Sequence, residues 1–345
     1  MKPSPRRGPG TAPSPDLAEA LRALDTGMDA TIAALCRLAR VPSVSARPVP
    51  DPAVRESAEL TAAFMREAGL ADAHLLEMPG AHPYVLGNRI EDPALPTLLL
   101  YAHHDVQPEG DPARWTSPPF QPTRRGDRIY GRGIVDDKAG VFVHLAAIAA
   151  WIRAAGRLPV NVRFIVEGEE EIGSEHLAAF LRRHRAQLEA DAIVLTDTAN
   201  LTAGLPSLTT RLRGLVKVQV EVRGYAHALH SGFWGGPVPD PVMGMCRMLA
   251  SLVRDDGRVA VPGCASGASR ATRAERDALA ALPFNERALR RDAGAVSGLR
   301  LHARGAAATY ASQWRAPALA ITALEASPVE GSSNQIVPFA RARVG

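Results

Sequence analysis

Cysteine and long apolar runs are both scarce in this 345-residue sequence. Its three cysteines, Cys36, Cys246 and Cys264, are too few and too widely spaced for a zinc knuckle or a disulfide framework, so a reducing, cytoplasmic setting is expected. We expect these cysteines to be buried as small hydrophobic side chains. No apolar run approaches the roughly 20 residues of a membrane-spanning helix, so no membrane partner is expected.

The sequence also lacks a strong excess of charge of either sign. The 40 basic and 36 acidic residues give a net charge of only +4, so nucleic acid is not an expected partner. Hydrophobic residues make up 46% and charged residues 22%, which is typical of a globular protein. Residues 1–15 are rich in Pro and Gly and lack the apolar core of a secretion signal, so they are predicted to form a disordered leader.

The first two thirds of the remaining chain alternate between helical and strand patterns. Apolar residues at a spacing of three to four predict helices at 16–40, 51–68, 138–154 and 174–188. Short apolar runs predict strands at 74–78, 84–90, 97–101, 160–166 and 192–195. This alternation predicts an α/β domain over residues 16–210, with a mostly parallel sheet and helices on both of its faces.

The pattern changes near residue 210. Residues 215–222 alternate apolar and polar side chains, as in a strand with one wet face, and two further strands are predicted at 318–324 and 335–344. A helix is predicted at 241–252. Residues 211–345 are therefore predicted to form a smaller α+β domain.

Imidazole and carboxylate side chains follow the predicted strands of the first domain. His103 and Asp105 follow one strand, Glu170 and Glu171 follow the next, Asp197 follows the last, and Asp136 and Asp137 lie in a glycine-bent loop. If they converge, the acids repel one another and need a cation to hold them. One imidazole with several carboxylates favours zinc, with manganese and cobalt as alternatives. A spare glutamate beside a metal-activated water would serve as general base.

Four segments, YAHHDVQP, YGRGIVDDKAG, VEGEEEIGSEHL and VLTD, carry a resemblance to a known family, and LHSGFWGG adds a fifth. The sequence resembles the co-catalytic zinc peptidases, which include aminoacylases, carnosinase-type dipeptidases, acetylornithine and succinyl-diaminopimelate deacylases and glutamate carboxypeptidases. The resemblance implies a dimetal catalytic domain followed by a lid domain through which two chains form a homodimer.

The resemblance also implies a role for each matching residue. His103 and Asp197 would bind the first metal, Asp136 would bridge two metals, and Glu171 would bind the second. Asp105 would fix the imidazole of His103, Glu170 would be the general base, and His230 would reach from the lid toward a partner subunit's site.

The EGEEE run permits a shift in register to Glu167 or Glu169, and the motif selects Glu170 and Glu171. His104 is expected on the opposite face of its strand, Asp137 as a cap or a brace of the turn, His144 as a core residue, and His227 as a loop residue.

The sequence departs from the family pattern at its end. Family members return to the catalytic domain after the lid and supply a last histidine ligand for the second metal, whereas this sequence stops at Gly345. We therefore expect a C-terminally truncated chain whose second metal site is incomplete. The leading hypothesis is hydrolysis of dipeptides or short peptides, because YxHxDVQP and Asp197 resemble the dipeptidase branch. The alternatives are an N-acyl amino acid deacylase, a carboxypeptidase, and a truncated, non-catalytic pseudo-peptidase.

Overall fold

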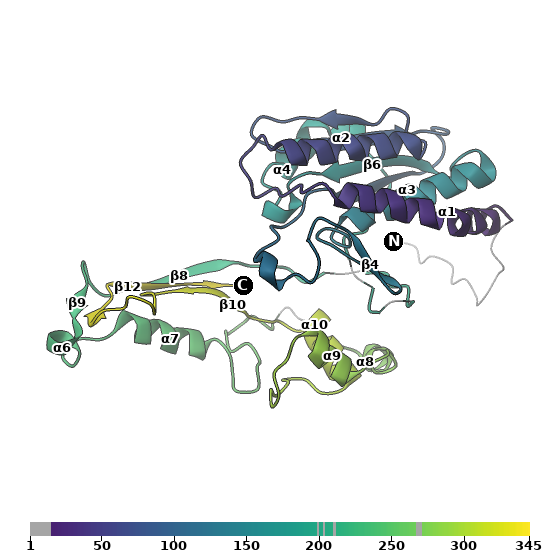
Figure 1. Cartoon of the computed structure of the whole chain (residues 1–345). Coiled ribbons are helices and arrows are strands. Elements are labelled where there is room, and N and C mark those ends of the chain that lie inside the picture. The colour runs from purple at the N-terminus through teal and green to yellow at the C-terminus, as the bar shows by residue number, and fades with distance from the viewer. Residues whose placement is uncertain (1–14, 199, 203, 210–211, 267–270) are drawn as a thin grey trace. The chain divides into compact units, whose positions relative to one another are not determined.

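The chain folds into two compact units, Met1–Ser207 and Leu208–Gly345 (Figure 1). The computed structural model describes residues 15–198, 200–202, 204–209, 212–266 and 271–345. Residues 1–14 of the predicted leader lie outside these ranges, as do residues 210 and 211 at the predicted domain boundary.

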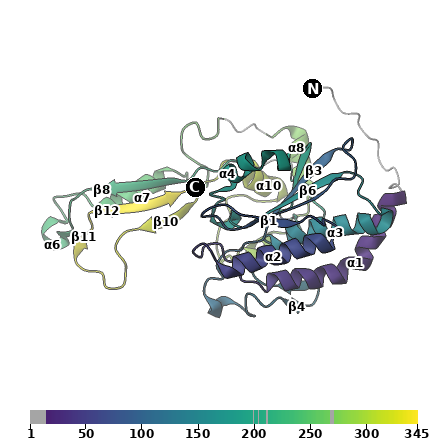
Figure 2. The same ribbon diagram turned by 90° about the horizontal axis from the view of Figure 1, so that it is seen from above.

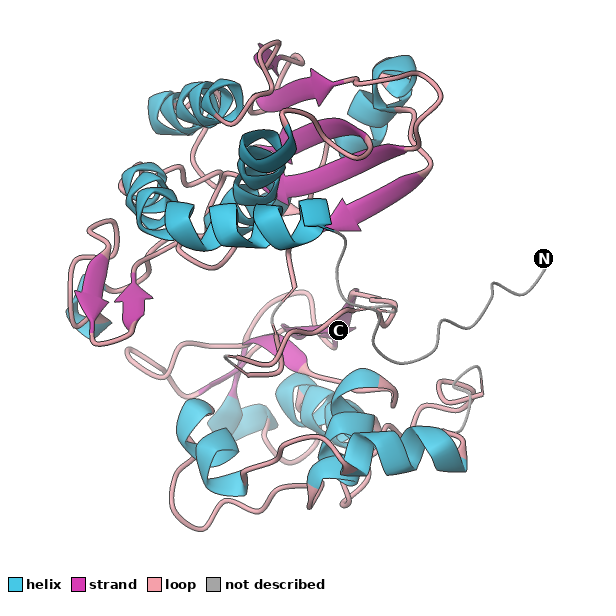
Figure 3. Ribbon diagram, turned by 90° about the vertical axis from the view of Figure 1, so that its right-hand side faces the viewer, coloured by secondary structure: helices cyan, strands magenta, loops and turns pink. Residues whose placement is uncertain are grey.

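The first unit is built on a five-stranded sheet with the order β1-β2-β6-β3-β7. Its strands are β1 (His74–Leu76), β2 (Tyr84–Arg89), β3 (Thr97–His103), β6 (Asn161–Glu167) and β7 (Ala192–Leu195). β3 is parallel to both β6 and β7, β2 is antiparallel to β6, and β1 is antiparallel to β2. Only β2 therefore runs against the other four strands, and the predicted mostly parallel sheet is confirmed (Figure 3).

Helices cover both faces of this sheet (Figure 2). One face carries α1 (Pro15–Ala39), α2 (Pro52–Glu67) and α3 (Lys138–Ala155), and the other carries α4 (Leu177–Arg183) and α5 (Arg185–Leu188). By length and composition alone α3 could cross a membrane, but Val141, Leu145 and Ile148 on this helix are buried in the core. A core helix commonly passes the same test, so this is weak evidence for a span.

The prediction of one helix at 174–188 is wrong, because the helix begins only at Leu177 and is interrupted at His184. Gly173 and Ser174 have φ angles of 98° and 55°, which no right-handed helix accepts. α2 begins as predicted: the Asp51 carboxylate accepts hydrogen bonds from the N–H groups of Ala53 and Val54.

The parallel strands bring the predicted site residues to one edge of the sheet. His103 is the last residue of β3 and is paired in register with Glu167, the last residue of β6. Glu170 and Glu171 follow in a short 3₁₀ turn, η2 (Glu170–Ile172), and Asp197 lies two residues beyond β7. A second 3₁₀ turn, η1 (Pro112–Arg114), and a hairpin of β4 (Thr123–Arg125) and β5 (Arg128–Tyr130) lie in the loop before α3.

The second unit contains a three-stranded antiparallel sheet with the order β10-β12-β8. The strands of this sheet are β8 (Val218–Arg223), β10 (Ile321–Glu325) and β12 (Phe339–Val344), and β9 (Leu229–His230) pairs with β11 (Gln335–Ile336) in a separate two-stranded sheet. The helices of the unit are α6 (Ser231–Trp234), α7 (Pro241–Ser251), α8 (Arg273–Ala280), α9 (Glu286–Asp292) and α10 (Ala306–Trp314). Met245 and Leu249 of α7 pack on Ala340 and Ala342 of β12. The predicted strand at 335–344 is instead two strands separated at Pro338, which has no N–H to donate to a ladder.

The prediction that the cysteines are buried is wrong for two of them. Cys36 is half-buried, but Cys246 and Cys264 are exposed, and all three are free thiols. Cys246 is exposed because α7 turns its neighbour Met245 toward the core and leaves the next position on the outer face.

Candidate metal centre

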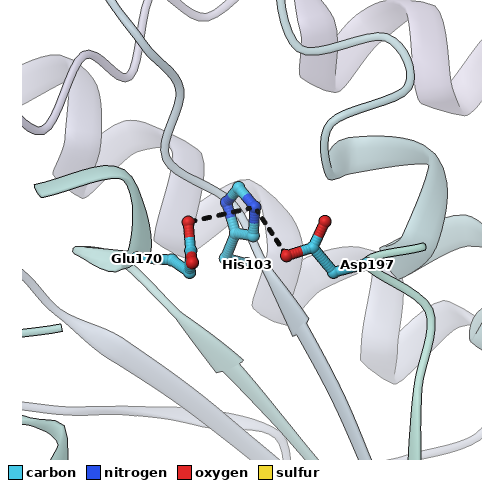
Figure 4. A group of neighbouring side chains, drawn as sticks. All are labelled: His103, Glu170 and Asp197. Atoms are coloured by element: carbon cyan, nitrogen blue, oxygen red, sulfur yellow. Dashed lines mark ion pairs between the residues drawn. The ribbon is translucent and has the colours of Figure 1, made fainter. Parts of the chain in front are cut away.

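His103 is the centre of a cluster of acids at the edge of the sheet. Its Nε2 lies 3.2 Å from Asp136 Oδ1 and 3.8 Å from both Glu170 Oε2 and Asp197 Oδ2. Figure 4 shows the carboxylates of Glu170 and Asp197 facing the imidazole ring from two sides. Two groups of three residues have ligand atoms within 4.8 Å of one another: His103, Glu170 and Asp197, and His103, Asp136 and Glu171. The other three predicted metal ligands, Asp136, Glu171 and Asp197, thus lie around the imidazole of His103, together with the predicted base Glu170.

The electrostatics of the cluster favour a cation. Burial raises the pKa values of Glu170, Glu171 and Asp197, and the charges of neighbouring carboxylates raise them further. Burial alone would lower the pKa of His103, but its hydrogen bond to Asp105 and the surrounding negative charges raise that pKa to about 10. One imidazole among several repelling carboxylates is a donor set that fits a divalent cation.

Asp105 connects His103 to the turn that carries Glu170 and Glu171. Its side chain is fully buried, and Oδ1 lies 3.3 Å from His103 Nδ1. The two carboxylate oxygens also accept hydrogen bonds from the backbone N–H groups of Glu170, at 3.2 Å, and Glu171, at 3.1 Å. Burial would raise the pKa of Asp105, but the hydrogen bond and charge of His103 lower it. The sequence pointed to the contact with His103 and gave no signal for the contacts with the two glutamates.

Gln107 is a further contact that the sequence reasoning missed. Its Nε2 donates to Glu171 Oε2 at 2.8 Å and to the Glu171 carbonyl at 2.9 Å, and its backbone N–H donates to Glu171 Oε1 at 3.2 Å. The only available signal was its place in the DVQP segment, two residues after Asp105.

The EGEEE run divides into two pairs of acids. Glu167 accepts a hydrogen bond from the Tyr101 hydroxyl at 2.7 Å, and Glu169 accepts one from the Tyr84 hydroxyl at 2.7 Å. Both carboxylates are buried, and neither belongs to the ligand groups found among the described residues. Glu170 and Glu171 are the two that reach the cluster.

The neighbours of the predicted ligands have other contacts. His104 is buried with its Nε2 3.0 Å from the Pro83 carbonyl, and burial lowers its pKa to about 4. Asp137 accepts a hydrogen bond from the backbone N–H of His103 at 3.2 Å, and burial raises its pKa to about 7. It makes no side-chain cap of α3, so it braces the end of β3 rather than capping the helix.

His144, His227 and His230 belong to neither of the two ligand groups. His144 is a core residue, as expected, with Nε2 3.2 Å from the Tyr101 carbonyl and 3.1 Å from Thr196 Oγ1. His230 lies in the second unit at the end of β9, where Nδ1 accepts the N–H of Gly232 at 3.1 Å. His227 lies in the loop that precedes β9. The predicted role of His230 therefore stays a prediction.

Comparison with known proteins identifies the family. Residues 99–309 match the profile of Peptidase family M20/M25/M40. The chain is 32% identical over 249 residues to a cysteinylglycine-S-conjugate dipeptidase of Corynebacterium striatum, covering 72% of this chain and 52% of that protein. It is 30% identical over 276 residues to a human Beta-Ala-His dipeptidase, covering 74% and 54%. The chain thus spans about half the length of these curated relatives.

A solved structure agrees with these matches. The M20 family metallo-carboxypeptidase Sso-CP2 from Sulfolobus solfataricus superposes with a TM-score of 0.78 at 26% identity, covering 91% of this chain and 70% of that one. The resemblance drawn from the sequence motifs is therefore confirmed. Because the family profile matches more than half of its residues, the chain belongs to Peptidase family M20/M25/M40.

Proposed function

We propose that this chain carries the metal-dependent site of a hydrolase that cuts the amide bond of dipeptides or short peptides. The observation that carries the proposal is the convergence of His103, Asp136, Glu171 and Asp197, with Glu170 beside them. The names of the two curated relatives support the substrate class, because both describe dipeptidases.

His103, Asp136 and Asp197 would hold a first divalent cation, and Asp136 with Glu171 would hold a second. We propose zinc, with manganese and cobalt as alternatives, since imidazole and carboxylate ligands suit all three. When bound, the cations supply Lewis-acid polarisation of the scissile carbonyl and lower the pKa of a water. The support from this chain is that two groups sharing His103, one with Glu170 and Asp197 and the other with Asp136 and Glu171, each have their ligand atoms within 4.8 Å of one another. Their carboxylates also outnumber the single imidazole.

Glu170 would be the general base. Its carboxylate is half-buried, and burial together with neighbouring acids raises its pKa. A raised pKa suits a carboxylate that takes a proton from the attacking water and passes it to the leaving amine. Asp105 would hold the turn that carries Glu170 in place, because its carboxylate accepts hydrogen bonds from the backbone N–H groups of Glu170 and Glu171.

The test is turnover by the purified chain with added zinc, manganese or cobalt. We expect hydrolysis of Cys-Gly or β-Ala-His, and a Glu170→Gln variant that binds metal but turns over at least about 100-fold more slowly. The matched control is Glu175→Gln, because Glu175 is exposed in the same loop and lies outside both ligand groups. Hydrolysis of N-acetyl amino acids without dipeptides would favour a deacylase, and cleavage of only the C-terminal residue of longer peptides would favour a carboxypeptidase.

A non-catalytic role is the second candidate. The observation that favours it is that His103 is the only imidazole in the two ligand groups among the described residues, so the second group shares it with the first. Tight binding of one cation per chain with no hydrolysis of any of these substrates would support the non-catalytic reading.

We further propose that the chain is cytoplasmic and forms a homodimer through its second unit, where His230 would serve the partner subunit's site. The three free thiols support a reducing compartment. The support for association is that β8 and β10 are edge strands with unpaired backbone groups among the described strands of their sheet. Light scattering of the purified chain tests this, and a monomer at micromolar concentration would contradict it.

A further inference from the structure

Glu169 is buried one residue before the proposed base, with its carboxylate fully engaged. Oε1 accepts hydrogen bonds from the Tyr84 hydroxyl at 2.7 Å and from the backbone N–H of His176 at 2.9 Å. Oε2 lies 3.0 Å from Nδ1 of His176. The Glu169 side chain is only 1% exposed and its contact with Tyr84 is buried, while its partner His176 is 32% exposed. Burial and the hydrogen bond to Glu169 raise the pKa of Tyr84, so its hydroxyl remains a donor.

These contacts tie the acid loop, residues 167–177, at two points outside the metal cluster. Tyr84 belongs to β2, and its ring stacks on Phe180 of α4 with ring centroids 4.0 Å apart. His176 directly precedes α4. The carboxylate of Glu169 therefore joins the loop both to the sheet and to the start of the helix that follows it.

The backbone of Glu169 closes the same loop. Its carbonyl accepts the N–H of Ser174 at 3.0 Å, in a turn where Gly173 and Ser174 both have positive φ angles. The carbonyl of Glu170 accepts the N–H of Gly173 at 2.8 Å. The turn that carries Glu170 and Glu171 is thus anchored through the residue that precedes it.

We propose that Glu169 is a positioning residue that holds Glu170 and Glu171 against His103. The inference rests on the proposed function only in the roles of Glu170 and Glu171. A buried carboxylate is costly to desolvate, and an apolar residue of similar size would fill the space at a lower cost. Its three hydrogen bonds satisfy the carboxylate, and they fix the geometry of the loop as an apolar contact would not.

The test compares Glu169→Ala, Glu169→Gln and the matched control Glu175→Ala, in which an exposed glutamate of the same loop is removed. Amide hydrogen exchange of peptides spanning 168–177 is measured in the metal-free chain. We expect exchange at least about tenfold faster in Glu169→Ala, since loss of buried charge-assisted hydrogen bonds shifts local opening by that order. Glu169→Gln keeps an acceptor for Tyr84 and for the His176 N–H and should restore most of the protection, while Glu175→Ala should match the parent chain.

Zinc affinity, measured by competition with a chromophoric chelator, is the second readout. We expect Glu169→Ala to weaken binding about 10- to 100-fold, as loss of other residues that orient metal ligands does, and Glu169→Gln to restore it to within a few-fold. If Glu169→Ala fails to fold, Tyr84→Phe removes one donor, keeps the ring, and should raise exchange in the same peptides. Unchanged exchange and unchanged affinity in Glu169→Ala, or in Tyr84→Phe if the former does not fold, would overturn the inference. If the parent chain binds none of zinc, manganese and cobalt, the proposed function fails, and the exchange result still decides the role of Glu169.

Discussion

The two strands that flank β3 are both parallel to it, but they differ sharply in burial. On the β6 side, Phe164, Ile165 and Val166 are at most 1% exposed. On the β7 side, Ile193 is 53% and Leu195 51% exposed, although parallel strands are usually covered on both faces. The acids that follow β6 are therefore placed by a packed core, and Asp197 is placed by a strand with little burial.

The hydrogen bonds follow the same division. On the β6 side, Asp105 and Glu169 have buried carboxylates, and each accepts hydrogen bonds from backbone N–H groups of the acid loop. On the β7 side, the backbone of residues 192–195 pairs with β3, and the side-chain contacts are few: Asp191 accepts a hydrogen bond from the backbone N–H of Thr97, and Thr196 contacts His144. We conclude that one side of the candidate site is preorganised by the fold and the other depends on few contacts.

Matched isoleucine variants should show the largest difference between the two sides. We expect Ile165→Ala on β6 to lower the free energy of unfolding by about 2–5 kcal/mol, because it empties space in the core. Ile193→Ala on β7 should cost less than about 1 kcal/mol, since half of that side chain is already in water. Urea denaturation of both variants provides the measurement, and equal losses would show that β7 is packed as firmly as β6.

Two aspartate variants should show the next largest difference between the two sides, measured as the free energy of unfolding of the metal-free chain at neutral pH. Asp105→Asn should lower the free energy of unfolding by about 1–3 kcal/mol, because the buried site loses its negative charge and one of the two oxygens that accept hydrogen bonds. The folded-state pKa of Asp197 is raised by burial and nearby acids, so its ionised form opposes folding above its ordinary pKa.

Asp197→Asn should therefore leave the free energy of unfolding unchanged or raise it slightly, while weakening metal binding. Urea denaturation in the presence of a chelator separates the two effects. A loss of stability in Asp197→Asn equal to that in Asp105→Asn would contradict the division into a preorganised side and a weakly held side.

The strand ends that carry the candidate ligands could be predicted from the sequence, because apolar runs broken by His or acidic residues are local patterns. The ends of α2 and β7 follow from equally local signals, such as the cap at Asp51. The interruption of the predicted helix at 174–188 could not be predicted from the sequence, since it depends on the positive φ angles of Gly173 and Ser174. The roles of Gln107 and Glu169 depend on partners 64 and 85 positions away, which no local pattern records.

A substitution at Gln107 should have a smaller effect, on metal affinity, on the preorganised side of the site. Gln107→Leu removes the amide that donates to the side chain and carbonyl of Glu171, and we expect the affinity of the Glu171 group for metal to fall by up to about tenfold. The effect is modest because these hydrogen bonds are exposed to water. Chelator competition measures it, with Gln121→Leu as the matched control, since Gln121 is exposed and lies outside both ligand groups. An equal change in both variants would show that the effect comes from removing an exposed amide and not from the contact with Glu171.

A substitution at Thr196 should give the smallest loss of unfolding free energy. It tests whether a side-chain hydrogen bond contributes to holding the end of β7. The Oγ1 of Thr196 lies 3.1 Å from His144 Nε2, and burial lowers the pKa of His144 to about 4, so the contact is between neutral groups at pH 7. Thr196→Val keeps the shape and removes this hydrogen bond, which should cost about 0.5–1 kcal/mol. Thr198→Val is the control, because Thr198 is exposed. Urea denaturation measures the loss of unfolding free energy. A loss above about 2 kcal/mol would be more than a neutral hydrogen bond normally contributes. It would mean that a buried network holds Asp197 as firmly as Asp105 holds the acid loop.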